Sequence, residues 1–436
     1  MTAESLAWNE TEHAPSTDTG LLRVCTAGSV DDGKSTLIGR LLYDSKSLAR
    51  DQLEHIQQAS RRRGHARADL SLVTDGLRAE REQGITIDVA WRHFHTPRRR
   101  FVLADTPGHE QYTRNMVTGC SVADVAIVLV DARHGLRIQS RRHALLAALL
   151  GVRHVVVCAN KMDLVGWDPA RFAAIRDGLT EFLRGHPRVS VHAIPMSALS
   201  GENVVERGDS CAGYDGPGLL ELLETLPVDR RARKTDLRLP IQWVIRPQGD
   251  GLEDYRGYAG RLASGTLERG EYVRVLPSGE RARVVRIETS GRDVDRVEAG
   301  RSVIVHLDRD TDATRGDMLV PLDDASLHTG KRLAADLVWM HAAPSRVGGT
   351  YTLAHATRTV RTVLERVRSV LDVTTLESHE SAELTVNGIG RVDLRASEAL
   401  VWDEYDRIRG TGSLVLVDPV TGDTVAAGLL RAVPHD

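Results

Sequence analysis

A glycine-rich stretch near the start of the chain carries the most specific chemical pattern in the sequence. Gly28-Ser29-Val30-Asp31-Asp32-Gly33-Lys34-Ser35 has the spacing G-x-x-x-x-G-K-[ST] and continues into Thr36. Such a loop presents backbone N–H groups to nucleotide phosphates, while its lysine contacts the β and γ phosphates and its serine hydroxyl ligates Mg²⁺. A glycine-rich turn that matches by chance is the alternative. The loop lies between an apolar run typical of a strand and a segment typical of a helix, which argues against chance.

Two further segments carry groups suited to the same chemistry. Asp105-Thr106-Pro107-Gly108-His109 follows a predicted strand, so the Asp105 carboxylate is expected to hold Mg²⁺ through a water and Gly108 to offer its N–H to a γ-phosphate. Thr86, within Gly84-Ile85-Thr86-Ile87, is expected to complete the Mg²⁺ shell. Taken alone, Asp105 could be a structural turn residue and Thr86 an exposed strand residue. Their order along the chain, after the phosphate loop, favours the functional interpretation.

His109 is the candidate for positioning the attacking water. A lone histidine beside a turn is usually structural, but this one directly follows the glycine expected at the γ-phosphate. A side chain there can orient a water for in-line attack without acting as a strong base. The predicted catalytic set is therefore His109, Lys34 and Thr86.

Two later segments have the chemistry of base recognition. In Asn160-Lys161-Met162-Asp163, an aspartate can accept two hydrogen bonds from the N1 and N2 edge of guanine, a pairing that adenine cannot make. The asparagine can bond the other edge of the ring, and the lysine stem can lie along the base. Ser197-Ala198-Leu199 is a weaker signal that could be only a turn. In this context it is expected to offer a backbone N–H to the guanine O6, so the predicted ligands are GTP and Mg²⁺.

The elements that must position these residues alternate in type along the first half of the chain. Predicted strands at 21–27, 85–94, 100–104, 125–130, 155–159 and 189–194 alternate with helices at 35–43, 139–150 and 169–183. The short, continuous, β-branched runs are typical of a mostly parallel sheet covered by helices on both faces. After a charged linker at 229–236, short β-type segments separated by Gly, Pro and Asp predict two β-barrels. We expect a disordered tail at 1–20, a GTP-binding domain at 21–228, and barrels at 236–324 and 330–436.

Composition narrows the class of protein. The 436 residues carry a formal net charge of −3, which argues against a dedicated nucleic-acid binder. The 4 cysteines are widely spaced, with no C-x-x-C pair, which suits a reducing compartment. The acidic start of the chain makes a secretory or transit peptide improbable, and no apolar run in the first half approaches a membrane span. We expect a cytoplasmic protein with no nucleic-acid or membrane partner.

Together, these five elements resemble those of the translation-factor class of P-loop GTPases. Gly84-Ile85-Thr86-Ile87 and Asp105-Thr106-Pro107-Gly108-His109, with two β domains after the GTPase domain as in elongation factor Tu, mark that class. Within it, several strings resemble the large, GTP-hydrolysing subunit of bacterial sulfate adenylyltransferase (ATP sulfurylase). They are the loop with its continuation at 28–44, the segments at 74–84 and 108–116, and the late strings at 387–391 and 410–413. The resemblance runs from about residue 20 to the end.

The resemblance implies a coupled reaction. In that family ATP and sulfate give adenosine 5′-phosphosulfate and pyrophosphate on a separate small subunit, and the GTPase subunit couples GTP hydrolysis to that uphill step. It therefore implies a hetero-oligomer with a small adenylyltransferase subunit. Some relatives carry an adenylylsulfate kinase domain after the third domain; with no second phosphate loop before Asp436, this chain is expected to serve adenylylsulfate formation only.

Departures from the family pattern leave other functions open. The segment 247–254 is longer than usual, Gly213 precedes Tyr214 where an aromatic pair is typical, and His355 stands where a lysine is expected. A specialised copy serving a sulfation pathway is thus one alternative. A translation-type factor that delivers aminoacyl-tRNA is another, disfavoured by the Asp31-Asp32 pair and the absence of a basic excess. A regulatory protein that binds GTP without appreciable hydrolysis is a third.

Overall fold

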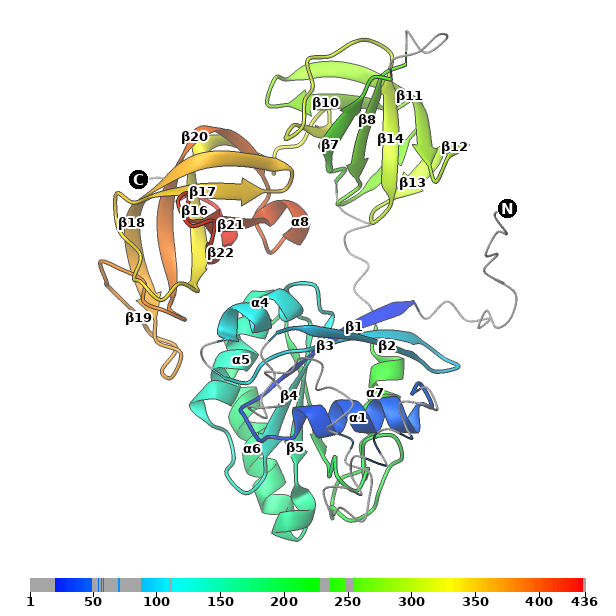
Figure 1. Ribbon diagram of the computed structural model, residues 1–436, viewed down its shortest axis with the longest axis vertical. Helices are drawn as coiled ribbons and strands as arrows, with labels where there is room; N and C mark the ends of the chain where they lie inside the picture. Colours follow the sequence, from blue (N-terminus) through cyan, green and yellow to red (C-terminus); the bar gives the residue numbers. More distant parts are fainter. Residues whose placement is uncertain are drawn as a thin grey trace. The chain divides into compact units, whose positions relative to one another are not determined.

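The structure is a computed structural model, and it describes residues 20–48, 54, 56, 58, 70, 88–109, 112–227, 236–247 and 255–433. The chain divides into two compact units, Met1–Val228 and Asp229–Asp436 (Figure 1). The tail expected at 1–20 lies outside the described residues except for Gly20, and Thr86 lies outside them as well. Each unit is described separately.

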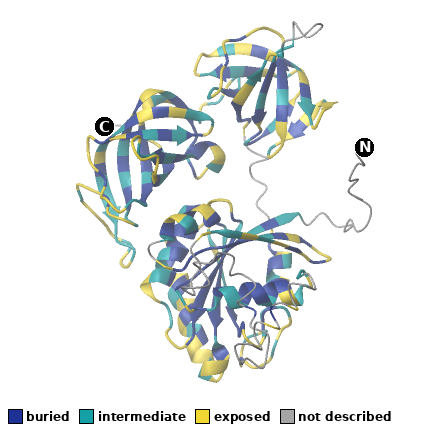
Figure 2. Ribbon diagram, viewed as in Figure 1, coloured by how far each residue is buried: buried dark blue, intermediate teal, exposed yellow. Residues whose placement is uncertain are grey.

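The first unit is built on a six-stranded sheet in the order β2-β3-β1-β4-β5-β6. Its strands are β1 (Leu21–Ala27), β2 (Ala90–His95), β3 (Arg100–Asp105), β4 (Val125–Asp131), β5 (His154–Asn160) and β6 (Ser190–Pro195). All neighbouring strands pair in parallel except β2, which runs antiparallel to β3. All seven residues of β4 are buried, as expected for a strand covered on both faces (Figure 2).

Helices cover both faces of this sheet (Figure 1). They are α1 (Lys34–Asp44), α4 (Thr113–Ser121), α5 (Ile138–Leu149), α6 (Pro169–Phe182) and α7 (Leu219–Thr225). The apolar stripe of α1, with Leu37, Ile38 and Leu41, joins Leu219 and Leu223 of α7 in one core cluster against the sheet. The mostly parallel α/β fold expected from the sequence is confirmed.

The strand order creates a topological switch point at the carboxyl end of β1, where successive connections go to opposite sides of the strand. After β1 the chain forms β2 and β3 on one side of it, while the later strands β4, β5 and β6 follow on the other side. In open α/β sheets, ligands bind at the carboxyl ends of strands around such a point. The loops after β1, β3, β5 and β6, which carry the four described sequence motifs, all leave the sheet at this edge.

The second unit contains two closed β-barrels. In the first, the sheet β10-β15-β7-β8-β14-β11 is closed by pairing of β10 with β11, and β12 extends it. The second barrel, β17-β21-β22-β16-β20-β18, is closed by pairing of β17 with β18, and β19 extends it. The strands of the first are β7 (Leu239–Ile245), β8 (Gly257–Arg261), β10 (Tyr272–Leu276), β11 (Glu280–Thr289), β12 (Arg292–Val294), β14 (Ser302–Leu307) and β15 (Met318–Pro321), with the small pair β9 (Thr266–Glu268) and β13 (Arg296–Glu298). Those of the second are β16 (His328–Trp339), β17 (Thr350–His355), β18 (Arg358–Leu371), β19 (Ser378–His379), β20 (Ile389–Trp402), β21 (Ser413–Val417) and β22 (Thr424–Arg431), with a short helix α8 (Arg409–Gly412).

A buried arginine ties the two barrels together. Arg238, just before β7, donates from Nε and Nη2 to the two carboxylate oxygens of Asp403, each at 2.8 Å. Its Nη2 also lies 2.5 Å from Oδ2 of Asp324, on the segment that links the barrels. The side chains of Arg238 and Asp403 are both fully buried. The charge of the guanidinium is therefore compensated by two carboxylates, as a buried ion requires.

No helix among the described residues combines the length and the apolar character needed to cross a membrane.

Candidate active site

The phosphate loop leaves β1 and turns directly into α1. Gly28 has φ +140° and Gly33 has φ +96°, conformations that side chains rarely adopt. A Cβ at Gly28 would lie 2.7 Å from the carbonyl oxygen of Leu129, and one at Gly33 would lie 2.4 Å from Nδ2 of Asn160. Both glycines of the motif are thus required by backbone conformation and by close packing. Val30, Ser35 and Thr36 complete the stretch, with Ser35 and Thr36 in the first turn of α1.

Lys34 lies folded over this loop. Its buried ammonium donates to the carbonyl oxygens of Gly28, at 3.1 Å, and Ser29, at 2.8 Å. Burial lowers the pKa of Lys34, and the nearby carboxylates of Asp105, Asp32 and Asp31 oppose this effect. The loop thus holds a buried positive charge beside the N-terminus of a helix, an arrangement that favours anions.

Asp32 stabilises the phosphate loop through a hydrogen bond within it. Its carboxylate accepts a hydrogen bond of 2.6 Å from the backbone N–H of Ser29. Burial is the main influence on Asp32 and raises the pKa of its carboxyl group, while the Ser29 hydrogen bond and Lys34 act in the opposite direction. The hydroxyl of Ser29 is buried and has no hydrogen-bond partner among the described residues, so it is a polar group that a ligand could satisfy.

The segment after β3 comes against the phosphate loop. A Cβ added at Gly108 would lie 2.4 Å from Nζ of Lys34 and 2.7 Å from the carbonyl oxygen of Gly28. Asp105 is buried and accepts a hydrogen bond of 3.3 Å from the hydroxyl of Thr26 on β1. Thr106 donates to the backbone carbonyl of the same Thr26. The structure therefore brings the Asp105–Gly108 segment, with Pro107, to the phosphate loop.

Of the two other predicted catalytic residues, the structure describes His109 but not Thr86. His109 is exposed, and its ring centroid lies 6.0 Å from that of Tyr112. Thr86 lies outside the described residues, so its expected role at Mg²⁺ stays a prediction. No group of three or more His, Cys, Asp or Glu that could hold a metal occurs in the described part of the chain. The predicted Mg²⁺ set of Ser35, Thr86 and Asp105 has one carboxylate and is not a site of that kind.

The side-chain amide of Asn160 joins two loops. Its Nδ2 donates to the carbonyl oxygen of Asp32 at 2.8 Å, and its Oδ1 accepts from the backbone N–H of Ala198 at 2.9 Å. The side chain is 2% exposed. The phosphate loop and the Ser197–Leu199 loop are thus connected through a single buried residue at the end of β5.

Lys161 and Asp163 flank this amide. Lys161 adopts φ +63°, donates to the carbonyl oxygen of Asp31, and lies 2.9 Å from Oδ2 of Asp131. Burial raises the pKa of Asp131, but hydrogen bonds from Arg133 and Lys161 outweigh burial and keep the pKa well below its ordinary value. Asp131 therefore stays ionised and fixes Lys161. Met162 is buried beneath, and Asp163 is exposed in the short 3₁₀ helix Met162–Val165.

The Ser197–Leu199 loop is held from the opposite side by Arg40 of α1. The Nη2 of Arg40 donates to the carbonyl oxygen of Leu199 at 2.6 Å, and its Nε donates to that of Ala198 at 3.4 Å. Since the N–H of Ala198 is directed at Asn160, the loop is fixed at both its donor and acceptor groups. Sequence reasoning singled out the loop but missed Arg40, which lies 158 residues away in the chain.

His143 of α5 is a second residue that sequence reasoning missed. Its Nδ1 accepts a hydrogen bond of 3.1 Å from the backbone N–H of Gly28, and its Nε2 lies 2.9 Å from Nε2 of Gln139. Burial, followed by the charges of Lys34 and Arg142, lowers the pKa of His143 to about 3. The ring is therefore neutral and supports the first glycine of the phosphate loop as an acceptor. No local pattern signals this role, because the two residues meet only through the fold.

Comparison with known families agrees with this geometry. Residues 19–228 match the elongation factor Tu GTP binding domain, and residues 332–431 match the GTP-eEF1A C-terminal domain-like family. The chain is 50% identical over 418 residues to the bifunctional enzyme CysN/CysC of Mycobacterium tuberculosis, covering 94% of this chain and 67% of that protein.

The chain covers a larger share of relatives that are named only sulfate adenylyltransferase subunit 1. The chain is 46% identical to sulfate adenylyltransferase subunit 1 of Shewanella oneidensis, covering 95% of this chain and 86% of the relative. It is also 46% identical to the protein of the same name in Vibrio campbellii, with 94% and 86% covered. The chain, with its elongation factor Tu type of GTP-binding domain, therefore belongs to the family of sulfate adenylyltransferase subunit 1, the GTP-hydrolysing subunit of that enzyme.

Proposed function

We propose that this protein hydrolyses GTP and couples the hydrolysis to the formation of adenosine 5′-phosphosulfate and pyrophosphate from ATP and sulfate on a small partner subunit. The observation that carries the hydrolytic part is the approach of Gly108 to Lys34 and Gly28. It brings the segment expected to sense a γ-phosphate to the lysine expected to bind one. The sulfate part rests on membership of the family.

Each residue of the site has a role in this proposal. Lys34 and the loop N–H groups bind the β and γ phosphates, and Asp163 with the Ser197–Leu199 loop selects guanine. His109 orients the attacking water over the γ-phosphate. Ser35, Thr86 and Asp105 would hold Mg²⁺, which supplies neutralisation of the charge that develops on the phosphate oxygens. The buried hydroxyl of Ser29 and the glycine-lined surface of the loop fit a phosphate ligand.

Coupling requires that the nucleotide state alter the partner subunit. Forming a phosphate–sulfate anhydride is strongly uphill, so adenylylsulfate would stay scarce without an energy source. Gly108 is suited to this task, because loss of the γ-phosphate removes the group that its N–H is expected to bind. Such coupling is reciprocal for binding, so the partner and its substrates must also change the affinity of this chain for GTP.

The direct test measures phosphate release from GTP by the purified chain with and without the small subunit, ATP and sulfate. We expect hydrolysis to rise only when all three are present, and adenylylsulfate to accumulate beyond its uncoupled level. Turnover indifferent to all three would refute the proposal. Tight binding of aminoacyl-tRNA to the GTP form would favour a translation-type factor instead.

Lys34→Ala tests the phosphate end of the site independently of the partner. The change removes the only lysine of the loop, so binding of GTP or its hydrolysis should be lost. Retention of both would show that Lys34 does not have the assigned role. Titration with a fluorescent GTP analogue separates loss of binding from loss of chemistry.

A further inference from the structure

Strand β7 of the first barrel contains an irregularity that turns a tryptophan outward. Ile241 pairs with Gly260, and Trp243 pairs with the adjacent Ala259, so Gln242 is an extra residue on this strand. In a regular strand Trp243 would point to the same side as the buried Ile241. The bulge instead leaves Trp243 66% exposed. Bulges often re-aim side chains at functional places, and an indole exposed to this degree is unusual on a folded surface.

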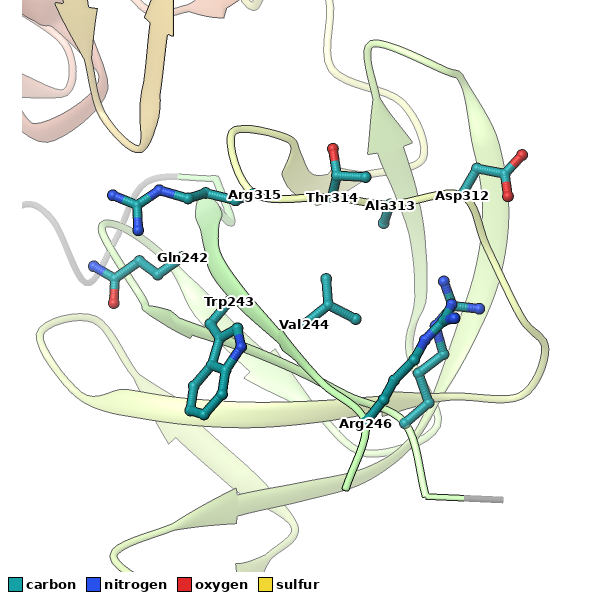
Figure 3. A pocket seen from close by; sticks show the side chains of 9 residues that line it. Gln242, Trp243, Val244, Arg246, Asp312, Ala313, Thr314 and Arg315 are labelled. Carbon is teal, nitrogen blue, oxygen red and sulfur yellow. The ribbon is translucent and has the colours of Figure 1, made fainter. Parts of the chain in front are cut away.

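A hollow of about 560 Å³ lies beside this tryptophan. Figure 3 shows its lining: Val244 points from β7 towards the loop that precedes β15, whereas the indole of Trp243 points away from that loop. Gln242, Trp243, Val244 and Arg246 come from β7 and its end, Arg256 from just before β8, and Asp312, Ala313, Thr314 and Arg315 from the loop. In Figure 3, Arg315 lies near Gln242 at one end of the hollow and Arg246 lies towards the other. We call this surface the Trp243 hollow.

The described residues that line the Trp243 hollow carry a net positive charge. They include three arginines and one carboxylate, Asp312, whereas the whole chain has a net charge of −3. Arg256 is occupied: its Nη1 lies 3.1 Å from Asp310, and its guanidinium lies over the ring of Tyr258. Arg246 and Arg315 are exposed, and neither has an ion pair or hydrogen bond with another residue that the structure describes. Within the described part of the chain, the guanidinium groups of Arg246 and Arg315 thus have no anionic partner, and they lie towards opposite ends of the hollow that Trp243 also lines.

We propose that the Trp243 hollow docks an acidic surface segment of the small adenylyltransferase subunit, with carboxylates on Arg246 and Arg315 and an apolar side chain against Trp243. This rests on the proposed function for the identity of the partner. Tryptophan and arginine are the residues that most often dominate binding energy at protein interfaces. Arginine also binds carboxylates through paired hydrogen bonds, which fixes orientation as well as affinity. A nucleic acid is disfavoured because it would approach a chain of net negative charge.

The test compares binding of the full-length chain to the purified small subunit at low and at high salt. The variants are Trp243→Ala and the double change Arg246→Glu with Arg315→Glu. Tyr272→Ala and Arg292→Glu are the matched controls, because both residues are exposed on the same barrel and neither lines the hollow. Hydrolysis of GTP by the isolated chain and its thermal unfolding are measured for every variant.

We expect Trp243→Ala to weaken binding by about 30-fold, the size of a dominant interface residue. The double arginine change should weaken it by at least about tenfold, mainly through slower association, and should abolish most of the salt dependence. Both controls should bind within about twofold of the unaltered chain, as expected for residues outside an interface. Hydrolysis by the isolated chain should not change in any of the variants.

The outcomes that overturn the inference can be told apart. If the unaltered chain fails to bind the small subunit, the proposed function fails together with this surface. If it binds and the Trp243 and arginine variants bind equally well, only the surface is wrong. If pyrophosphate protects the unaltered chain from unfolding but not the double variant, while subunit binding is unchanged, the hollow is an anion site and the docking proposal is wrong.

Discussion

Gly108 illustrates how little space separates the phosphate loop from the segment after β3. Any side chain there would meet the ammonium of Lys34 and the backbone of Gly28 and Ser29. The backbone atoms cannot retreat without moving the loop, whereas the lysine can be displaced only by losing its hydrogen bonds to two carbonyls. This close approach therefore requires a residue without a side chain at position 108.

We predict that Gly108→Ala lowers GTP hydrolysis by at least about tenfold while the domain remains folded, because a shift of about an ångström in a catalytic group can cost this much or more. Single-turnover hydrolysis and nucleotide titration would measure the effect. Gly185→Ala is the matched control, since a Cβ there meets nothing within 4 Å. Equal loss in both variants would show that the effect is general destabilisation.

Asp163 tests base selection. Asp163→Asn should weaken GTP binding by about 10- to 150-fold, the cost of losing hydrogen bonds to a charged group of about 1.5–3 kcal/mol. Xanthosine triphosphate should bind the variant better than GTP, because xanthine replaces the N2 donor with an acceptor. Competition between the two nucleotides measures the preference. An unchanged preference for guanine would place base recognition elsewhere, and exposed Asp177→Asn serves as the control.

Helix α5 acts on the site through His143. The neutral ring accepts the N–H of Gly28, so the helix and the first residue of the phosphate loop are joined by a hydrogen bond between two fully enclosed groups. A proton on the ring would convert this acceptor into a donor and place a second positive charge near Lys34. The hydrogen bond from Gly28 to α5 therefore requires His143 to stay neutral.

This arrangement predicts a pH dependence of stability with a definite sign. The pKa of His143 falls from 6.5 to about 3 on folding, so below pH 6.5 the unfolded chain binds more protons than the folded one. The contribution of a neutral His143 is complete above pH 6.5 and decreases as the pH falls towards about 3. Between pH 6.5 and roughly pH 5 it should cost up to about 2 kcal/mol.

Urea unfolding of the chain and of His143→Gln near neutral pH and near pH 5 would measure this contribution. The glutamine can still accept the Gly28 hydrogen bond but does not titrate, so its loss of stability on acidification should be smaller by about 2 kcal/mol. His93→Gln, at an exposed position on β2, should behave like the unaltered chain. An equal loss in all three proteins would mean that His143 does not titrate differently on folding.

Sequence patterns predicted the elements well where the pattern is local. The strands at 21–27, 125–130 and 155–159 were expected within one residue of their observed ends, because their apolar runs are buried on both faces. The strand expected at 85–94 begins at Ala90 in the described part of the chain, since Asp88 and Val89 are not in a strand.

The supports of the site were not predictable in the same way. Arg40, Asp131 and His143 reach the motifs across long stretches of chain, and each contact depends on the order of strands in the sheet. The bulge at Gln242 also escaped prediction, because alternation alone places Trp243 on the buried face. Local spacing defines the groups that do chemistry, while tertiary packing selects the ones that hold them.

At the scale of the whole molecule, the stability of the unit that contains the two barrels depends on Arg238. We predict that Arg238→Ala destabilises the barrel unit by about 3–5 kcal/mol, because it leaves Asp403 and Asp324 buried without their cation. Chemical unfolding followed by the tryptophans would show this as an earlier transition. Arg269→Ala is the control: its pair with Asp295 is exposed, so the change should be below about 1 kcal/mol. Similar effects of both changes would contradict the role assigned to the buried pair.

The amide of Asn160 has a consequence for how the two ends of a nucleotide reinforce one another. The buried side chain of Asn160 is hydrogen-bonded to both the phosphate loop and the Ser197–Leu199 loop. Ordering either loop should therefore also order the other. A guanosine fragment and a free triphosphate fragment, supplied separately, should then bind cooperatively, each lowering the entropic cost of admitting the other. In the intact nucleotide the base and the phosphates are covalently linked, and Asn160 adds a second coupling between their two loops. A wrong base would then also weaken binding of the phosphates, where hydrolysis takes place.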